Sequence, residues 1–250
     1  MWCNRCTFTG FIKIGKVTDT ATGDKLRLWK CKRCGNQQAD PPPFVRSTPK
    51  ELYFDIETAP MVSFLWSLRV PSKYINPDMI IKDWFVISWA ASWMDEKEVY
   101  SGCVTAAAAK KGDDKKIMRP LWNLLDAADI VVGHNSNKFD IKKVNTRFEL
   151  HGFGPPRKYR QLDTLVVAKK YFAFDSNKMD FISEKFGGIK KHDMEFDDWK
   201  QAVGGDVKTL TKMERYNKND VVMGKRIYNR IKSWINPYPN RPRDGYKVAL

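Results

Sequence analysis

Hydrophobic positions along the central part of the chain follow two different spacings. Short apolar runs rich in aromatic and β-branched residues predict β-strands, and they lie at residues 52–56, 84–93, 99–104 and 130–132. Apolar residues at three- and four-residue intervals predict helices, and they cover about 116–128, 139–150, 165–174, 181–185 and 211–235. Strands come early, and strands and helices alternate later. That order predicts an α/β fold with a mixed sheet flanked by helices.

The N-terminal segment carries four of the five cysteines, as two Cys-x-x-Cys pairs. The paired residues are Cys3, Cys6, Cys31 and Cys34. Each pair can form a knuckle, and the strand-like runs between the pairs can form a β-hairpin that completes a tetrahedral four-thiolate site for one structural Zn²⁺. Disulfides or free thiols are the alternative. A segment this short cannot build a core alone, which favours a small zinc ribbon.

Prolines at residues 41–43 and at 49 follow this ribbon. Such a stretch resists both helix and sheet and favours an extended spacer, so it predicts a domain boundary. We expect four parts in the chain. They are a zinc ribbon over 1–38, a Pro-rich linker over 39–50, one large domain over 51–235 and a Pro/Arg-rich tail over 236–250.

The net charge points to the kind of partner. Lys and Arg number 44 against 29 Asp and Glu, which gives +15 at pH 7, and an excess of cations favours a polyanion such as nucleic acid. Improved solubility is the ordinary alternative. No apolar run is long enough to span a bilayer, and the N-terminus lacks a signal-peptide core, so we expect no membrane partner and an intracellular location. Cytoplasm, nucleoid or, for a viral protein, an infected host cell would all fit.

Two acids lie in the first strand of the large domain. Strand alternation places Asp55 and Glu57 side by side on one face. Adjacent like charges are costly unless a cation neutralises them, and hard oxygen ligands suit Mg²⁺ or Mn²⁺. Acids on the solvent face of a strand are the ordinary alternative. Asp193 and Glu195 share this spacing but lie in a polar stretch that indicates a solvated loop.

Two further acids have a comparable context. Asp140 lies where a short apolar strand gives way to a helix, which is where α/β proteins place ligands, although a first-turn acid also interacts favourably with the helix dipole. Tyr216 and Asp220, at i and i+4, share one face of the last helix, which Thr211 and Glu214 predict to begin with a capping box. A core tyrosine and a surface acid are the alternative, but an acid on an apolar stripe is unusual.

Three motifs in this order carry a family resemblance. They are Phe-Asp-Ile-Glu-Thr at 54–58, Gly-His-Asn-Ser-Asn-Lys-Phe-Asp at 133–140 and Tyr-Asn-Lys-Asn-Asp at 216–220. They resemble the Exo I, Exo II and tyrosine-type Exo III motifs of DEDDy exonucleases in the DnaQ-like, RNase H-like superfamily. The resemblance is greatest to the proofreading domains of family B DNA polymerases and related stand-alone nucleases. It covers about residues 51–235, and it does not include the ribbon, the 58–84 segment or any polymerase region.

The resemblance implies roles for particular residues and for cofactors. Asp55 would bridge two Mg²⁺ or Mn²⁺ ions, Glu57 and Asp220 would complete one metal site, and Asp140 would hold the second. Tyr216 would orient the attacking water. Substrate contacts are expected from one amide near the terminal nucleotide and from aromatic side chains that can stack on bases. These residues are Asn135, Phe64, Trp66 and Tyr74.

The implied activity is removal of 5'-mononucleotides from the 3' end of single-stranded DNA, or of RNA, in proofreading or end processing. A DNA polymerase or another replisome component would be recruited through the ribbon or the tail. Alternatives are a structure-specific endonuclease, an RNA-trimming enzyme and a non-catalytic nucleic-acid- or polymerase-binding module. Intact acids at all four positions argue against the non-catalytic alternative.

Overall fold

The computed structural model describes residues 11–18, 23, 25–39, 49–67, 69, 71, 74–188 and 194–235. The chain divides into two compact units, residues 1–48 and 49–250. Four predicted features lie wholly or mostly outside the described residues: the cysteines Cys3 and Cys6, the Pro-rich linker, the acid Asp193, and the tail over 236–250.

The N-terminal unit contains a three-stranded antiparallel sheet. Its strands are β1 (Phe11–Thr18), β2 (Lys25–Cys31) and β3 (Gln37–Ala39), in the order β1-β2-β3. This confirms the predicted hairpin. Cys31 ends β2 and is buried, and a turn carries Cys34. The Gly35 amide donates to the Cys31 carbonyl at 3.0 Å, and the positive φ of Gly35, 71°, supplies the left-handed residue that this turn requires.

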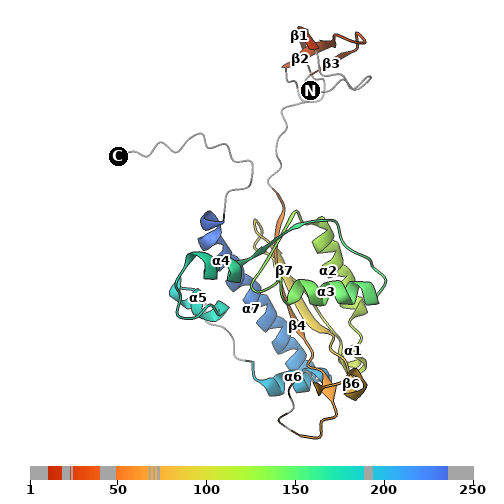
Figure 1. Ribbon diagram of the computed structural model, residues 1–250, viewed down its shortest axis with the longest axis vertical. Helices are drawn as coiled ribbons and strands as arrows, with labels where there is room; N and C mark the ends of the chain where they lie inside the picture. Colours follow the sequence, from red (N-terminus) through yellow and green to blue (C-terminus); the bar gives the residue numbers. More distant parts are fainter. Residues whose placement is uncertain are drawn as a thin grey trace. The chain divides into compact units, whose positions relative to one another are not determined.

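A five-stranded mixed sheet forms the centre of the large unit (Figure 1). Its strands are β4 (Glu51–Thr58), β7 (Val86–Trp93), β8 (Tyr100–Cys103), β9 (Ile130–Gly133) and β10 (Arg160–Asp163). The order is β10-β9-β4-β7-β8, with β4, β9 and β10 parallel and β7 antiparallel to both of its neighbours. This confirms the predicted mixed sheet and places β4 at its centre.

Helices cover both faces of this sheet (Figure 1). They are α1 (Ala106–Lys111), α2 (Lys115–Ala127), α3 (Asp140–Leu150), α4 (Thr164–Tyr171), α5 (Met179–Lys185), α6 (Phe196–Val203) and α7 (Val207–Ile231), which continues into η3 (Lys232–Trp234). The predicted alternation of β4 is confirmed. Its residues Leu52, Phe54 and Ile56 join the core formed with α2 and α3, whereas Tyr53 joins the core formed with α7.

Some elements differ from the prediction. The last helix begins at Val207, because the side chain of Asp206 caps it by accepting the Thr209 amide at 2.8 Å. Thr211 lies inside the helix and donates its hydroxyl to the Val207 carbonyl, so the predicted capping box at Thr211 is wrong. A capping box does occur at α6, between Glu195 and Asp198. Glu195 therefore caps a helix in a stretch whose composition predicts a solvated loop.

The segment between β4 and β7 forms a small separate sheet. It contains β5 (Val62–Ser63), η2 (Pro77–Met79) and β6 (Ile80–Lys82), with β5 and β6 paired antiparallel. This segment follows directly after the strand that carries Asp55 and Glu57. Its exposed aromatic side chains lie in the connection between β5 and β6, beyond that end of β4.

Candidate active site

Three acids from two elements converge beside the sheet. Asp55 and Glu57 come from β4, and Asp220 comes from α7, which packs across β4 and β7. Each offers a carboxylate oxygen, and these atoms all lie within 4.8 Å of one another. Asp55 and Glu57 are half-buried, and Asp220 is only 2% exposed. A cluster of hard oxygen donors at this separation fits a divalent cation such as Mg²⁺ or Mn²⁺.

A fourth acid, Asp140, lines the same cleft as this cluster and comes from a third element. It is the first residue of α3, and its Oδ1 accepts the backbone amide of Ile56, which lies between Asp55 and Glu57, at 3.2 Å. The pKa of Asp140 is raised to about 7, mainly by burial and to a smaller extent by the nearby charge of Asp163, against the opposing effect of hydrogen bonds from the amides of Asp140 and Ile56. A buried carboxylate with a raised pKa is stabilised when a cation neutralises it. All four acids line one cleft of about 470 Å³.

A hydrogen bond that the sequence does not predict orients the Asp55 carboxylate. Asn217 of α7 is fully buried, and its Nδ2 donates to Asp55 Oδ2 at 2.7 Å. It lies three residues before Asp220, so one helix face supplies both an acid and a group that orients a second acid. Its position next to Tyr216, on the inward stripe of a helix, is the signal that could have suggested this role.

A buried acid shapes the loop that precedes Asp140. Asp163, at the end of β10, accepts the backbone amides of Asn135 at 2.8 Å, Asn137 at 3.2 Å and Leu165 at 2.9 Å. Among the described residues other than glycine, Asn135 alone has a positive φ, of 63°. Asparagine tolerates this left-handed conformation better than most residues. The carboxylate of Asp163 therefore fixes the loop that presents Asn135 to the cleft.

Histidine and the start of α5 complete the wall of the cleft. The two ring nitrogens of His134 lie 2.9 Å from the Thr164 hydroxyl and 2.9 Å from the Asn177 carbonyl, so the ring connects the loop before α3 to the segment before α5. Further lining residues that the sequence does not indicate are Phe139, Lys178, Met179 and Asp180.

The predicted tyrosine and the three predicted aromatic contacts are not among the described residues that line the cleft. Tyr216 is buried one turn before Asp220, with its ring 6.4 Å from that of Trp199 of α6 in an edge-on arrangement, and it is not among the described residues that line the cleft. Phe64, Trp66 and Tyr74 are exposed on the segment between β4 and β7, and Trp66 is 97% exposed. These three side chains are open to a ligand, but none of them lines the cleft.

Comparison with known proteins identifies the family. The family model described as the RNase_H superfamily matches residues 82–232, and the chain belongs to this superfamily. The structure is similar to that of the family B DNA polymerase from the hyperthermophilic archaeon Pyrobaculum calidifontis, with a TM-score of 0.54 and 16% sequence identity. The match covers 90% of this chain and 28% of that polymerase chain, and at this identity it concerns the fold.

No curated protein matches the sequence. None of the described helices is long and apolar enough to cross a membrane. Membership of the superfamily, together with the acidic cluster, supports a metal-dependent nuclease role on a nucleic-acid substrate. The family match begins after β4 and therefore does not include Asp55 and Glu57. Their place in the site is given by the structure.

Proposed function

We propose that the protein is a two-metal 3'-5' exonuclease of the DEDDy type that removes 5'-mononucleotides from the 3' end of single-stranded DNA or RNA. The observation that carries this proposal is the convergence of Asp55, Glu57, Asp140 and Asp220 on one cleft from three elements far apart in sequence. The order and spacing of the three motifs give the subtype, and the superfamily supports phosphodiester hydrolysis.

The residues of the cleft divide into ligands and groups that orient them. When bound, divalent metal ions would activate a water molecule and stabilise the leaving oxygen of an in-line displacement. Asp55, with Glu57 and Asp220, would hold one ion, and Asp55 with Asp140 would hold the other. The Asn217 amide keeps one oxygen of Asp55 in a fixed direction, which favours a defined metal geometry. The Tyr216 hydroxyl would orient the attacking water from the turn before Asp220.

The remaining roles rest on charge and exposure. A net charge of +15 favours a phosphate backbone, and the exposed rings of Phe64, Trp66 and Tyr74 offer surfaces on which bases can stack. The four cysteines of the N-terminal unit would hold one Zn²⁺, and this ribbon or the C-terminal tail would contact a polymerase or another replication protein.

A labelled-strand assay tests the proposal. With Mg²⁺ or Mn²⁺, a 5'-labelled linear single strand should shorten step by step from its 3' end, and a circular strand should persist. Asp55→Asn should reduce the rate by several orders of magnitude, on the order of 10³-fold or more, because it removes a metal ligand. The matched control is Asp126→Asn, which changes an acid paired with Arg157 outside the cleft. Nicking of the circle would instead support an endonuclease, and equal loss in both variants would contradict the assigned site.

A further inference from the structure

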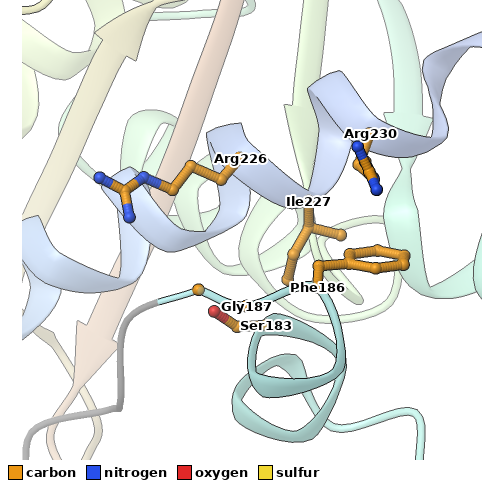
Figure 2. A pocket seen from close by; sticks show the side chains of 7 residues that line it. Ser183, Phe186, Gly187, Arg226, Ile227 and Arg230 are labelled. Atoms are coloured by element: carbon orange, nitrogen blue, oxygen red, sulfur yellow. The ribbon is translucent and has the colours of Figure 1, made fainter.

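A second pocket lies at the opposite end of α5 from the acidic cleft. It has a volume of about 180 Å³ and lies between the C-terminal end of α5 and the C-terminal part of α7 (Figure 2). Phe186, Gly187 and Gly188 line it from the α5 side. From the α7 side it is lined by Arg226, Ile227 and Arg230, and we call it the arginine pocket.

On the α5 side, Gly187 and Gly188 line the pocket with backbone atoms only. The Gly187 amide donates to the Glu184 carbonyl at 2.9 Å, and the Gly188 amide donates to the Ser183 carbonyl at 2.8 Å. This is the pattern that ends a helix with a left-handed glycine, and Gly187 has a φ of 69°. A side chain at Gly188 would clash with Ser183. The turn therefore adds no side chain that would fill the space in front of α7.

The charge on the pocket is positive and not neutralised by the described residues. Arg226 and Arg230 are exposed and lie one turn apart on α7, and neither makes an ion pair or hydrogen bond to a described residue. No carboxylate is among the described residues that line the pocket. The Arg230 guanidinium lies 6.0 Å from the centre of the Phe186 ring. Figure 2 shows the Arg226 and Arg230 side chains pointing in different directions on either side of Ile227. Guanidinium groups match phosphate oxygens in geometry and charge, so each of them can bind an anion of this class at the pocket.

The two pockets are connected by the same pair of helices. The start of α5 lines the acidic cleft, and its end lines the arginine pocket. On α7, Arg226 and Arg230 follow Asp220 by six and ten residues, which corresponds to about 9 to 15 Å along the axis at 1.5 Å per residue. A stacked strand that rises about 3.4 Å per nucleotide covers this distance in roughly three to four nucleotides.

We propose that the arginine pocket binds a backbone phosphate of a single-stranded nucleic acid, a few nucleotides away from the 3' end held in the acidic cleft. The inference rests on the proposed function, because it takes the cleft as the place where the strand ends. The pocket then anchors strands that are long enough to reach it and does not touch shorter ones. Strands of at least about four nucleotides are favoured because they bind more tightly, and the rate of the chemical step stays the same.

Strand binding without cleavage tests the pocket directly. The affinity of a 5'-labelled 12-nucleotide single strand is measured by fluorescence anisotropy in buffer without Mg²⁺ or Mn²⁺, over a range of salt concentrations. The double variant Arg226→Gln/Arg230→Gln should bind on the order of 10-fold more weakly, and the slope of log affinity against log salt should fall by about 0.7 for each phosphate that the variant no longer neutralises. Lys115→Gln/Lys116→Gln, at the exposed start of α2, removes the same charge and should change affinity less than about 2-fold.

Substrate length separates this inference from the proposed function. With Mg²⁺, the arginine double variant should cleave a dinucleotide at the wild-type rate, which would also show that the variant is folded. It should cleave a 12-nucleotide strand with a raised KM. Equal losses in both double variants would indicate diffuse charge and overturn the inference, as would unchanged binding in the arginine variant. If the wild type binds strands through the arginines yet cleaves nothing, the pocket stands and the proposed function fails.

Discussion

Replacing Asp140 by asparagine tests whether the negative charge of the acidic cleft lowers the stability of the protein when no cation is bound. The substitution removes one negative charge and retains a side-chain oxygen that can accept the Ile56 amide, as Asp140 Oδ1 does at 3.2 Å. Burial raises the pKa of Asp140 from 3.8 to about 7. The folded protein therefore holds this proton more tightly than the unfolded chain does.

The sign of the effect follows from this raised pKa. Below about pH 4 the carboxyl group is protonated in both states, and it costs no stability. As the pH rises from 4 through 7, the folded protein must either keep the proton or bury a charge, so its stability falls. A difference of about three pKa units corresponds to at most about 4 kcal/mol at pH 8. Burying the amide NH2 donor of asparagine at this position costs about 1 to 2 kcal/mol, so we expect a net gain of about 2 kcal/mol.

Thermal unfolding in buffers without Mg²⁺ or Mn²⁺ measures this gain. Asp140→Asn should melt roughly 4 to 8 °C above the wild type at pH 8. Near pH 4, where the wild type no longer buries a charge, the advantage should be lost and the variant should melt slightly below the wild type. Added Mn²⁺ should stabilise the wild type more than the variant, because the variant lacks one ligand. Asp126→Asn, outside the cleft, should show none of these differences. A variant that is less stable at pH 8, or an advantage that persists unchanged at pH 4, would contradict a destabilising buried charge at Asp140.

Three further substitutions test the packing, the orientation of a ligand and the ribbon. Gly224→Ala should destabilise the large unit by roughly 3 kcal/mol in urea unfolding, because the added Cβ would overlap the Tyr53 ring and hydroxyl. Asn217→Ala should raise the Mn²⁺ concentration needed for half-maximal cleavage by about 10- to 100-fold, because the Asp55 carboxylate loses its hydrogen bond. Cys31→Ser should abolish a zinc content of about one per chain in elemental analysis and leave the melting temperature of the large unit unchanged.

The sequence predicts the parts of the fold in which periodicity is strong. The alternation of β4 correctly separates Leu52 and Phe54 from Asp55, since each face of that strand meets a different layer. By contrast, β10 has little apolar character of its own and is a strand because it pairs in parallel with β9. The helix α6 escapes prediction because it is only eight residues long and follows a polar stretch, and its start depends on the reciprocal bonds of its capping box.

The candidate site is predictable as far as its acids are concerned. Asp55 and Asp220 each occupy positions where a charge contradicts the local apolar pattern, which is a signal that one sequence can carry. Asp163 gives no such signal, and Asn217 gives only its polar character on the inward stripe of a helix, which does not identify its partner. Asp163 acts through backbone amides of a loop 26 to 28 residues away, and Asn217 acts on an acid 162 residues away. Such partners follow only from tertiary structure.

The long separation between the acids of the cleft has a consequence for the life of the chain. Position 55 lies on a central strand and position 220 on a late helix, so no early fragment contains a complete set of carboxylates. On the proposed function, a chain on the ribosome would acquire cleavage activity only after α7 has been synthesised and has packed on β4 and β7. Loss of this packing in the finished protein would remove Asp220 from the cleft, so cleavage would report directly on the docking of α7.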